Sequence, residues 1–203
     1  MDSSDSLSGS SVFLGDAFAP KKIRRRHKKL TPSDLIYNND KWSLTPVKLL
    51  GQGSYGAVVH AVDRGFHYAV KIVNLNETKW ESEIEREIDN LRRAEDSAEL
   101  SKLLPKLYDT HKQTIGDCTY IFLLMELIIG TTLYKIIYYS DPDITQLTKK
   151  LLTGLSTLHR HGFIHRDIKP DNVIITESGQ LKFLDLGFSC FKYREHECFS
   201  AHR

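Results

Sequence analysis

A short polar segment near the carboxyl end of the chain carries the residues best suited to chemistry. Positions 165–172 read His-Arg-Asp-Ile-Lys-Pro-Asp-Asn, so an acid, a cation and an amide lie within six residues. Pro170 does not continue a helix, because it lacks a backbone N–H and its φ angle is fixed. We therefore expect a loop that holds Asp167, Lys169 and Asn172 in fixed positions.

Two strand-like runs at 172–176 and 181–185 follow this loop and flank a four-residue turn that contains a glycine. If the residues that flank the turn face each other, the antiparallel register places Asn172 opposite Asp185. Opposed side chains on one face of a sheet lie about 5 Å apart. An amide oxygen and a carboxylate at that distance are suitable ligands for Mg²⁺. The register thus predicts a metal site at these two residues, close to Asp167.

A glycine-rich stretch lies nearer the amino end. Residues 51–58 read Gly-Gln-Gly-Ser-Tyr-Gly-Ala-Val, and a turn at 63–65 leads to a further strand at 67–73, which carries Lys71. Dinucleotide-binding folds also use G-x-G-x-x-G, but in them a helix follows the last glycine, whereas here another strand-like run does. We expect a hairpin whose glycines let backbone N–H groups approach phosphate oxygens. A plain flexible turn explains the glycines alone, but not the lysine that follows them.

A helix expected over residues 78–94 would supply a partner for Lys71. The apolar residues that repeat at helical spacing in it are Ile84, Ile88 and Leu91. Glu87 lies at the margin of this stripe, on the side expected to face the sheet. Glu83, one turn earlier, is the alternative partner. A helix whose glutamates all face solvent is the remaining interpretation.

The other apolar patterns place further elements around these segments. Strands are expected at 43–50, 106–111 and 119–126. A short helix is expected at 131–139 and a long one at 143–161, which Gly162 would end. The apolar face of the long helix consists of Ile144, Leu147, Leu151, Leu155 and Leu158.

Together, these segments resemble the motifs of the protein kinase family. The polar loop resembles H-R-D-x-K-x-x-N, residues 185–187 resemble the metal motif D-x-G, and Ala-Val-Lys at 69–71 resembles the lysine-bearing strand. The run Arg-Glu-Ile-x-x-Leu at 86–91 is similar to the regulatory helix of the family. A lysine two positions after Asp167 resembles the serine/threonine branch. The resemblance covers about residues 42–189.

The resemblance implies an α+β fold of the protein-kinase type. A kinase domain would span residues 31–203. Its small lobe, at about 42–126, would be an antiparallel β-sheet with the regulatory helix. A hinge at about 126–130 would lead to a partial, mostly helical large lobe at about 131–203.

The resemblance also implies a role for each polar residue. Asp167 would accept or orient the proton of a substrate hydroxyl, and Lys169 would face the transferred γ-phosphate. Lys71 would contact the α- and β-phosphates of ATP and pair with Glu87. The residues implied as ligands of Mg²⁺ are Asn172 and Asp185.

An ATP site follows from the same resemblance. Val58 and Ala69 would sandwich the adenine ring, Met125 would be the gatekeeper, and backbone groups of Glu126 and Ile128 would bind the adenine edge. The full set of implied nucleotide-binding residues is Leu50, Gly51, Gln52, Gly53, Ser54, Tyr55, Gly56, Ala57, Val58, Ala69, Lys71, Met125, Glu126 and Ile128.

The composition fits one globular domain with a charged tail. The 203 residues are 40% hydrophobic and 27% charged. Residues 1–30 contain seven Lys or Arg against three Asp, so this segment alone accounts for the net charge of +2. We expect it to be disordered. It would serve as a nuclear import signal, a docking strip for acidic partners, a nucleic-acid or lipid contact, or only a solvated linker. We do not expect nucleic acid to be the principal partner.

The cysteines and the apolar runs bear on location. Three cysteines are an odd number without close pairing, and the start of the chain has no apolar signal segment. We expect a reducing compartment, cytoplasmic or nuclear. The most apolar run, 120–130, contains Glu126 and is shorter than the ~20 residues that span a bilayer. A zinc site from Cys190, His196, Cys198 and His202 would be an alternative, but the spacing matches no zinc pattern.

The segment after the metal motif departs from the family pattern. Leu186 replaces the usual Phe, and no A-P-E motif follows before Arg203. We expect a domain truncated after the start of the activation segment, with part of the leucine face of the helix at 143–161 free for a protein partner. The residues conceivable as phosphate acceptors near Arg166 are Ser189, Tyr193 and Ser200. The expected activity is an ATP-dependent protein serine/threonine kinase, impaired by truncation. The alternative is a catalytically weak, nucleotide-binding regulator or decoy.

Overall fold

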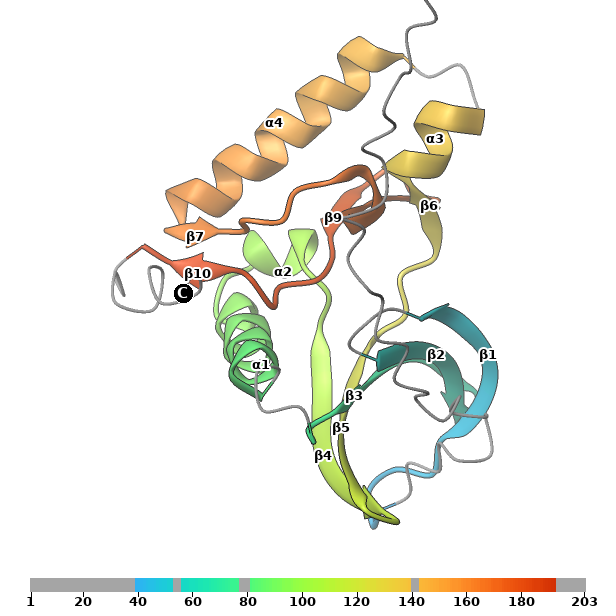
Figure 1. Cartoon of the computed structure of the whole chain (residues 1–203). Helices are drawn as coiled ribbons and strands as arrows, with labels where there is room; N and C mark the ends of the chain where they lie inside the picture. The colour runs from blue at the N-terminus through green and yellow to red at the C-terminus, as the bar shows by residue number, and fades with distance from the viewer. Residues whose placement is uncertain (1–38, 53–55, 77–80, 140–142, 193–203) are drawn as a thin grey trace, which may run out of the picture.

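The computed structural model describes residues 39–52, 56–76, 81–139 and 143–192 (Figure 1). The basic tail expected at 1–30 lies outside the described residues, and so do three residues of the glycine-rich stretch and two of the conceivable phosphate acceptors. The three residues of the glycine-rich stretch are Gly53, Ser54 and Tyr55. The two conceivable phosphate acceptors are Tyr193 and Ser200.

A five-stranded antiparallel sheet forms the first half of the described chain. Its strands are β1 (Thr45–Gln52), β2 (Gly56–Asp63), β3 (Phe66–Asn74), β4 (Leu107–Ile115) and β5 (Cys118–Glu126), in the spatial order β1-β2-β3-β5-β4. These runs are rich in β-branched and aromatic residues, which favour strands. The β2–β3 hairpin turns at Arg64 and Gly65, whose φ angles are both positive (48° and 83°). Two positive φ angles are what a tight two-residue hairpin turn requires.

The two faces of this sheet bury different cores. Alternate residues of β3 point to opposite sides, so Lys71 and Val73 share one face while Val70 and Ile72 share the other. The core on the second face also contains Leu44, Val59, Ala61, Tyr120, Phe122 and Leu124. The face of Val73 packs against helix α1 (Glu81–Glu95). Strand β3 therefore directs Lys71 toward α1.

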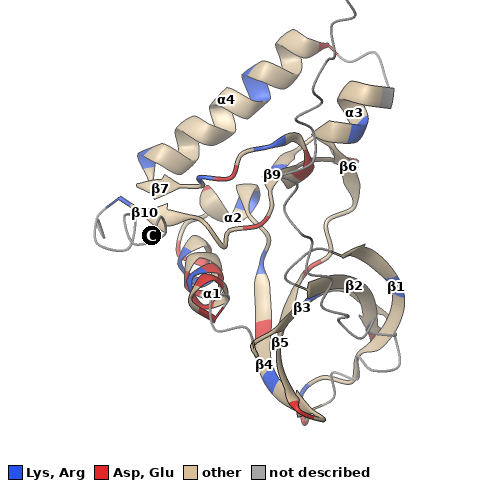
Figure 2. Ribbon diagram, in the orientation of Figure 1, with Lys and Arg blue, Asp and Glu red and all other residues tan. Residues whose placement is uncertain are grey.

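Helix α1 is amphipathic and has charges that suit its ends. Acidic residues lie in its first turn and basic residues in its last, which is the favourable arrangement in the field of the helix dipole. Figure 2 shows this mixture of acids and bases along α1, in contrast to the mostly uncharged α3 and α4. The buried residues of α1 are Ile84, Glu87, Ile88, Asn90, Leu91 and Ala94. Two of these, Glu87 and Asn90, are polar and need partners.

A second set of elements follows β5. These are β6 (Gly130–Thr132), α3 (Leu133–Tyr139), α4 (Ile144–Arg160), β7 (Phe163–Ile164), a 3₁₀ turn (Pro170–Asn172), β8 (Val173–Thr176), β9 (Leu181–Phe183) and β10 (Cys190–Phe191). Strands β6, β8 and β9 form one sheet, and β7 pairs with β10. The short helix α2 (Leu100–Leu103) contacts α1, α4 and β9. We call β1 to β5 with α1 the small lobe, and α3, α4 and β6 to β10 the large lobe.

The long helix α4 is bounded by side-chain and backbone signals that the sequence provides. The side chain of Asp143 accepts a hydrogen bond from the N–H of Gln146 at 3.0 Å and caps the amino end. Gly162 has a φ angle of 73° just past the carboxyl end, where a left-handed residue closes a helix. Leu158 is buried in the core, whereas Ile144 and Leu152 are 58% and 60% exposed. In Figure 1, α4 lies at the top of the view and the five-stranded sheet at the bottom.

The β8–β9 hairpin differs by one residue from the register expected from the sequence. The N–H of Leu184 donates to the carbonyl of Asn172 at 2.8 Å, so Asn172 lies opposite Leu184 and not opposite Asp185. The cause is Gly179, whose φ angle of 77° allows a loop of three residues, 177–179, in place of four. The expectation of a direct Asn172–Asp185 pair is therefore wrong.

Three smaller differences have local causes. The helix expected at 131–139 begins at Leu133, because Thr131 pairs with Ile175 in the sheet of the large lobe. Strands β4 and β5 are longer than expected, because a tight turn that contains Gly116 (φ 60°) joins them. Cys190 is disulfide-bonded, which does not fit the absence of pairing read from the cysteine spacing.

The architecture confirms the expected α+β fold, with an antiparallel sheet and its helix followed by a partly helical lobe. None of the helices in the described ranges is long and apolar enough to span a bilayer. Of the four residues in the alternative zinc site, only Cys190 is described, and no cluster of three or more metal-ligating side chains occurs among the described residues.

Candidate active site

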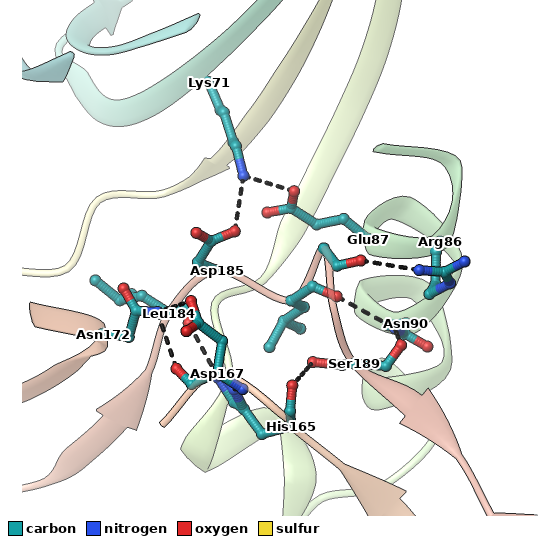
Figure 3. A network of polar contacts seen from close by, with 12 residues as sticks. Lys71, Arg86, Glu87, Asn90, His165, Asp167, Asn172, Leu184, Asp185 and Ser189 are labelled. Atoms are coloured by element: carbon teal, nitrogen blue, oxygen red, sulfur yellow. Dashed lines mark hydrogen bonds and ion pairs between the residues drawn. The ribbon is translucent and has the colours of Figure 1, made fainter. Parts of the chain in front are cut away.

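Lys71 lies at the centre of the polar contacts between the two lobes (Figure 3). Its Nζ atom is 2.6 Å from Oε2 of Glu87 on α1 and 3.2 Å from Oδ1 of Asp185, which follows β9. Glu87 is buried, and the apolar stripe of α1 turns it toward β3. The structure thus brings together three residues singled out from the sequence, and it pairs Lys71 with Glu87.

The charges of Lys71 and Asp185 stabilise each other, whereas burial raises the pKa of Glu87 despite the ammonium of Lys71 beside it. Burial by itself lowers the pKa of Lys71, but the carboxylates of Glu87 and Asp185 outweigh burial and hold this pKa above its usual value. Burial by itself raises the pKa of Asp185, but the ammonium groups of Lys71 and then Lys169 keep it below its usual value. Lys71 is therefore positively charged and Asp185 negatively charged at neutral pH.

The loop at 165–172 gathers a second polar group. Oδ2 of Asp167 accepts hydrogen bonds from Nζ of Lys169 at 2.7 Å and from Nδ2 of Asn172 at 2.8 Å. The 3₁₀ turn Pro170–Asn172 folds the chain back, so that Nδ2 of Asn172 also reaches the carbonyl of Asp167 at 3.0 Å. The hydrogen bond to Asp167 raises the pKa of Lys169. The structure thus fixes the orientation of the Asp167 carboxylate from two sides.

His165 holds this loop against the segment that bears Asp185. Its Nε2 atom donates to the carbonyl of Leu184 at 3.0 Å, and its Nδ1 atom accepts from the N–H of Asp167 at 3.3 Å. A neutral imidazole with the proton on Nε2 satisfies both contacts. Burial lowers the pKa of His165, which favours this neutral form. The His165 ring therefore links the loop at 165–172 to the backbone just after β9 through two hydrogen bonds.

The residues expected around the adenine ring lie on the face of the sheet that carries Lys71. Val58 lies opposite Lys71 in the β2–β3 register, and Met125 lies opposite Ala69 in the β3–β5 register. Directly opposed residues of antiparallel strands point to the same side. Ala57 is an exception: it lies opposite Ile72 and is buried on the other face. Its side chain does not belong to this set.

The end of the glycine-rich stretch requires a glycine for steric reasons. Gly56 has a φ angle of 156°, and a Cβ atom there would lie 1.8 Å from the carbonyl oxygen of Ile72. At Gly51 a Cβ atom would meet nothing within 4 Å. Leu50, Gly51 and Gln52 are exposed. The close approach of β2 to β3 thus fixes one glycine of the motif, while the others are free of such contacts or lie outside the described residues.

The hinge is tied to the large lobe through Glu126. Its N–H donates to the carbonyl of Lys106 at 2.8 Å. Its side chain is 2.6 Å from Nζ of Lys182 on β9, and this lysine is buried. Ile128, the second expected hinge contact, is half-buried two residues later. The ion pair connects the hinge to the hairpin that leads to Asp185.

Four residues of this site were given no role in the sequence analysis. They are Arg86, Asn90, His165 and Lys182. Asn90 carried the clearest signal, because an asparagine inside the apolar stripe of a helix is unfavourable without partners. Ser189 was named as one of three conceivable phosphate acceptors, but it is completely buried and its Oγ atom donates to the carbonyl of His165 at 3.1 Å. Its burial contradicts that expectation for the folded segment.

Comparison with known proteins identifies the family. Residues 44–202 match the family model described as the protein kinase domain. The chain is 31% identical over 147 residues to sperm motility kinase 2B of Mus musculus, an alignment that covers 70% of this chain and 28% of that protein. It is 29% identical over 184 residues to the serine/threonine-protein kinase CBK1 of Pneumocystis carinii, which covers 86% of this chain and 33% of that protein.

A third relative gives the same result. The serine/threonine-protein kinase greatwall of Mus musculus is 32% identical over 152 residues, which is 71% of this chain and 16% of that protein. The chain thus spans a third or less of the length of these relatives. The family match covers most of the chain, including Lys71, Asp167 and Asp185. The chain belongs to the protein kinase family.

Proposed function

We propose that the chain transfers the γ-phosphate of ATP to a serine or threonine hydroxyl of a protein substrate. The observation that carries the proposal is the meeting of two polar groups from different parts of the chain. One consists of Lys71, Glu87 and Asp185, and the other of Asp167, Lys169 and Asn172. Catalysis of phosphoryl transfer is mostly positioning and charge neutralisation, and these groups provide both.

The residues present fit Mg²⁺ and ATP. Asp185 is an ionised carboxylate, and Nδ2 of Asn172 is occupied by Asp167, which leaves the amide oxygen of Asn172 as a hard ligand. Lys71 is held in place as a cation for phosphate oxygens. Val58, Ala69 and Met125 provide an apolar surface on the same face for a ring. Mg²⁺ bound by Asn172 and Asp185 would neutralise charge on the phosphates.

The loop residues have separable roles in this proposal. Both contacts of Asp167 within the described residues fall on Oδ2, so Oδ1 is the oxygen that would accept or orient the proton of the substrate hydroxyl. Lys169 is half-exposed and would offer its charge to the transferred phosphate. The serine/threonine preference is supported by Lys169 and by the names of two of the relatives.

The direct test is phosphate transfer from labelled ATP to a generic basic protein. The wild-type chain should transfer label, and Asp167→Asn should reduce the rate by about 100-fold or more, because general-base catalysis and alignment are both lost. Asp171→Asn, an exposed acid of the same loop, is the matched control and should retain the wild-type rate. Equal transfer by wild type and Asp167→Asn would remove the assignment.

The exposed apolar residues of α4 favour a second candidate, a nucleotide-binding regulator that acts through a protein partner. Ile144 and Leu152 lie at the surface of a helix with few charges (Figure 2). This candidate predicts that Mg-ATP raises the melting temperature by ligand binding while phosphate transfer stays at background. Clear, Asp167-dependent turnover would count against it.

A further inference from the structure

Asn90 is a buried amide on the face of α1 that also carries Glu87. Asn90 is only 4% exposed. It lies three positions after Glu87 and is therefore one turn further along the same face of the helix. Its Nδ2 atom donates to the carbonyl of Ser189 at 3.0 Å and to that of Leu186 at 3.4 Å. Both acceptors belong to the segment just after Asp185 (Figure 3).

Side chains of both lobes donate to the carbonyls around Asp185, and the backbone N–H of Ser189 also donates to the carbonyl of Leu186 at 3.0 Å. The carbonyl acceptors and their side-chain donors are Leu184 with His165, Leu186 and Ser189 with Asn90, Gly187 with Arg86, and Phe188 with Arg166. Two of the four donors, Arg86 and Asn90, come from α1. The other two come from the loop at 165–172. The backbone on both sides of Asp185 is thus fixed from both lobes.

Asp185 needs this support because of its backbone conformation. Its φ angle is 62°, in the left-handed region that residues other than glycine adopt infrequently. Such a conformation persists where surrounding contacts hold it. The same conformation turns the carboxylate of Asp185 toward Lys71, to which it lies within 3.2 Å. The carbonyl contacts and the direction of this carboxylate are therefore linked.

The identity of residue 90 is explained by these contacts and not by packing. An apolar residue would continue the stripe of Ile84, Ile88 and Leu91, and would avoid the cost of burying an amide. Asparagine also favours a helix interior less than leucine does. What it adds is one NH₂ group whose two hydrogens reach two backbone carbonyls of another element.

We propose that Asn90 is a positioning residue of the metal site: it holds the backbone of residues 186–189 against α1 so that the carboxylate of Asp185 keeps the direction that binds Mg²⁺. The inference rests on the proposed function, because it concerns the metal that accompanies the nucleotide there. Asn90 touches neither nucleotide nor metal and acts through Asp185.

The first test measures nucleotide binding with and without metal. The affinity of the purified chain for ADP is determined by calorimetry in Mg²⁺ and again in EDTA. Asn90→Leu keeps the size of the side chain and removes both donors. It should reduce the gain in affinity caused by Mg²⁺ roughly tenfold, as the loss of an outer-shell partner does at other metal sites. Binding in EDTA should stay within about twofold, because Lys71 and the apolar face remain intact.

Asp89→Leu is the matched control, because it places the same residue at the adjacent, exposed position of α1. It should show the wild-type gain. An Asn90→Leu protein with the same Mg²⁺ gain as Asp89→Leu would overturn the proposal. So would an equal loss in Mg²⁺ and in EDTA, which is the result expected of a purely structural role. If Asn90→Leu does not fold, Asn90→Ser is measured by the same criteria.

The second test is independent of turnover. Hydrogen exchange of the metal-free chain should be faster over residues 184–191 in the Asn90 variant than in Asp89→Leu, with β2 and β3 unchanged. Equal exchange over that segment would contradict the proposal. If the wild type binds Mg-ADP but transfers no phosphate, the proposed function fails while both tests of Asn90 are still decided. If it binds no Mg-ADP, both proposals fail.

Discussion

At the scale of single residues, the charge of Lys71 is the feature on which the site depends. Glu87 and Asp185 are two acids from different elements, and the ammonium of Lys71 lies within 3.2 Å of both. Without it, two carboxylates would face each other in a largely buried place, which is unfavourable. Lys71 therefore has a structural role besides the function proposed for it, and stability measurements report on the structural role.

We expect Lys71→Met to lower the free energy of unfolding by about 2 to 3 kcal/mol, because removing one partner leaves a buried carboxylate unpaired. Chemical denaturation measures this change. Lys112→Met is the matched control: its ion pair with Glu81 is at the surface, and its loss should change stability by less than about 0.5 kcal/mol. The double variant Lys71→Met with Glu87→Leu should recover part of the loss. Equal effects of Lys71→Met and Lys112→Met would contradict this interpretation.

His165 gives a prediction about pH. Its pKa is lowered from the usual 6.5 by burial, so below that pH the unfolded chain binds a proton that the folded chain excludes. Stability is therefore complete above about pH 6.5 and is lost as the pH falls toward the lower pKa of the folded state. His165→Gln retains a donor and an acceptor without titrating. Its unfolding free energy should fall less steeply between pH 7 and 5, and a slope identical to that of the wild type would exclude His165 as the cause.

At the scale of elements, the sequence predicts which segments form helices and strands better than it predicts how they pair. The stripe of α1, the leucine repeat of α4 and the glycine after α4 are local signals, and the structure agrees with them. The β8–β9 register depends on the conformation of Gly179, which an alternating pattern does not specify, so it was expected one residue away. Strand pairing is set by the turn as much as by the strands.

The site was predictable to a similar degree. The residues of the motifs, such as Lys71 and Asp167, are recognisable because their chemistry requires those residue types. The donors to backbone carbonyls, such as Asn90 and Lys182, were missed because a carbonyl accepts from many kinds of side chain. The face on which Ala57 lies could not be predicted, because the phase of β2 relative to Lys71 follows only from the strand register.

The close approach of β2 and β3 leads to a prediction at the same scale. Gly56→Ala should lower the free energy of unfolding by at least about 2 kcal/mol, because a Cβ atom 1.8 Å from the carbonyl of Ile72 forces the two strands apart. Gly51→Ala is the control from the same motif and should have little effect, since nothing lies within 4 Å of its Cβ position. Thermal unfolding compares the two. Similar melting temperatures for both variants would show that the strands adjust without cost.

At the scale of the whole molecule, a few polar contacts join the lobes. They include the ion pair of Lys71 with Asp185, the hydrogen bond from Asn90 to the segment after Asp185, and the ion pair of Glu126 with Lys182. Lys182 is buried and also donates to the carbonyl of Leu104 at 3.3 Å. The chain matches the protein kinase domain over residues 44–202 and spans a third or less of the length of the relatives compared. Whether its two lobes unfold together can be measured on this chain directly.

We expect Lys182→Met to weaken that cooperation, because it leaves the carboxylate of Glu126 without its cation. Tryptophan fluorescence reports on the first half of the chain, where Trp42 lies, and circular dichroism includes the large contribution of α4. The two unfolding curves should coincide in the wild type and separate in the variant. Lys150→Met is the control, because Nζ of Lys150 donates to Gly179 within the large lobe. Coincident curves in Lys182→Met would mean that other contacts suffice.

The complete burial of Ser189 has a consequence for the timing of chemical modification. A modifying enzyme reaches an enclosed hydroxyl only during brief excursions in which the surrounding chain lifts away. The rate at which this serine is modified would therefore report how often the surrounding segment opens. Any change that made these openings more frequent would be recorded as faster modification, even if the resting arrangement stayed the same.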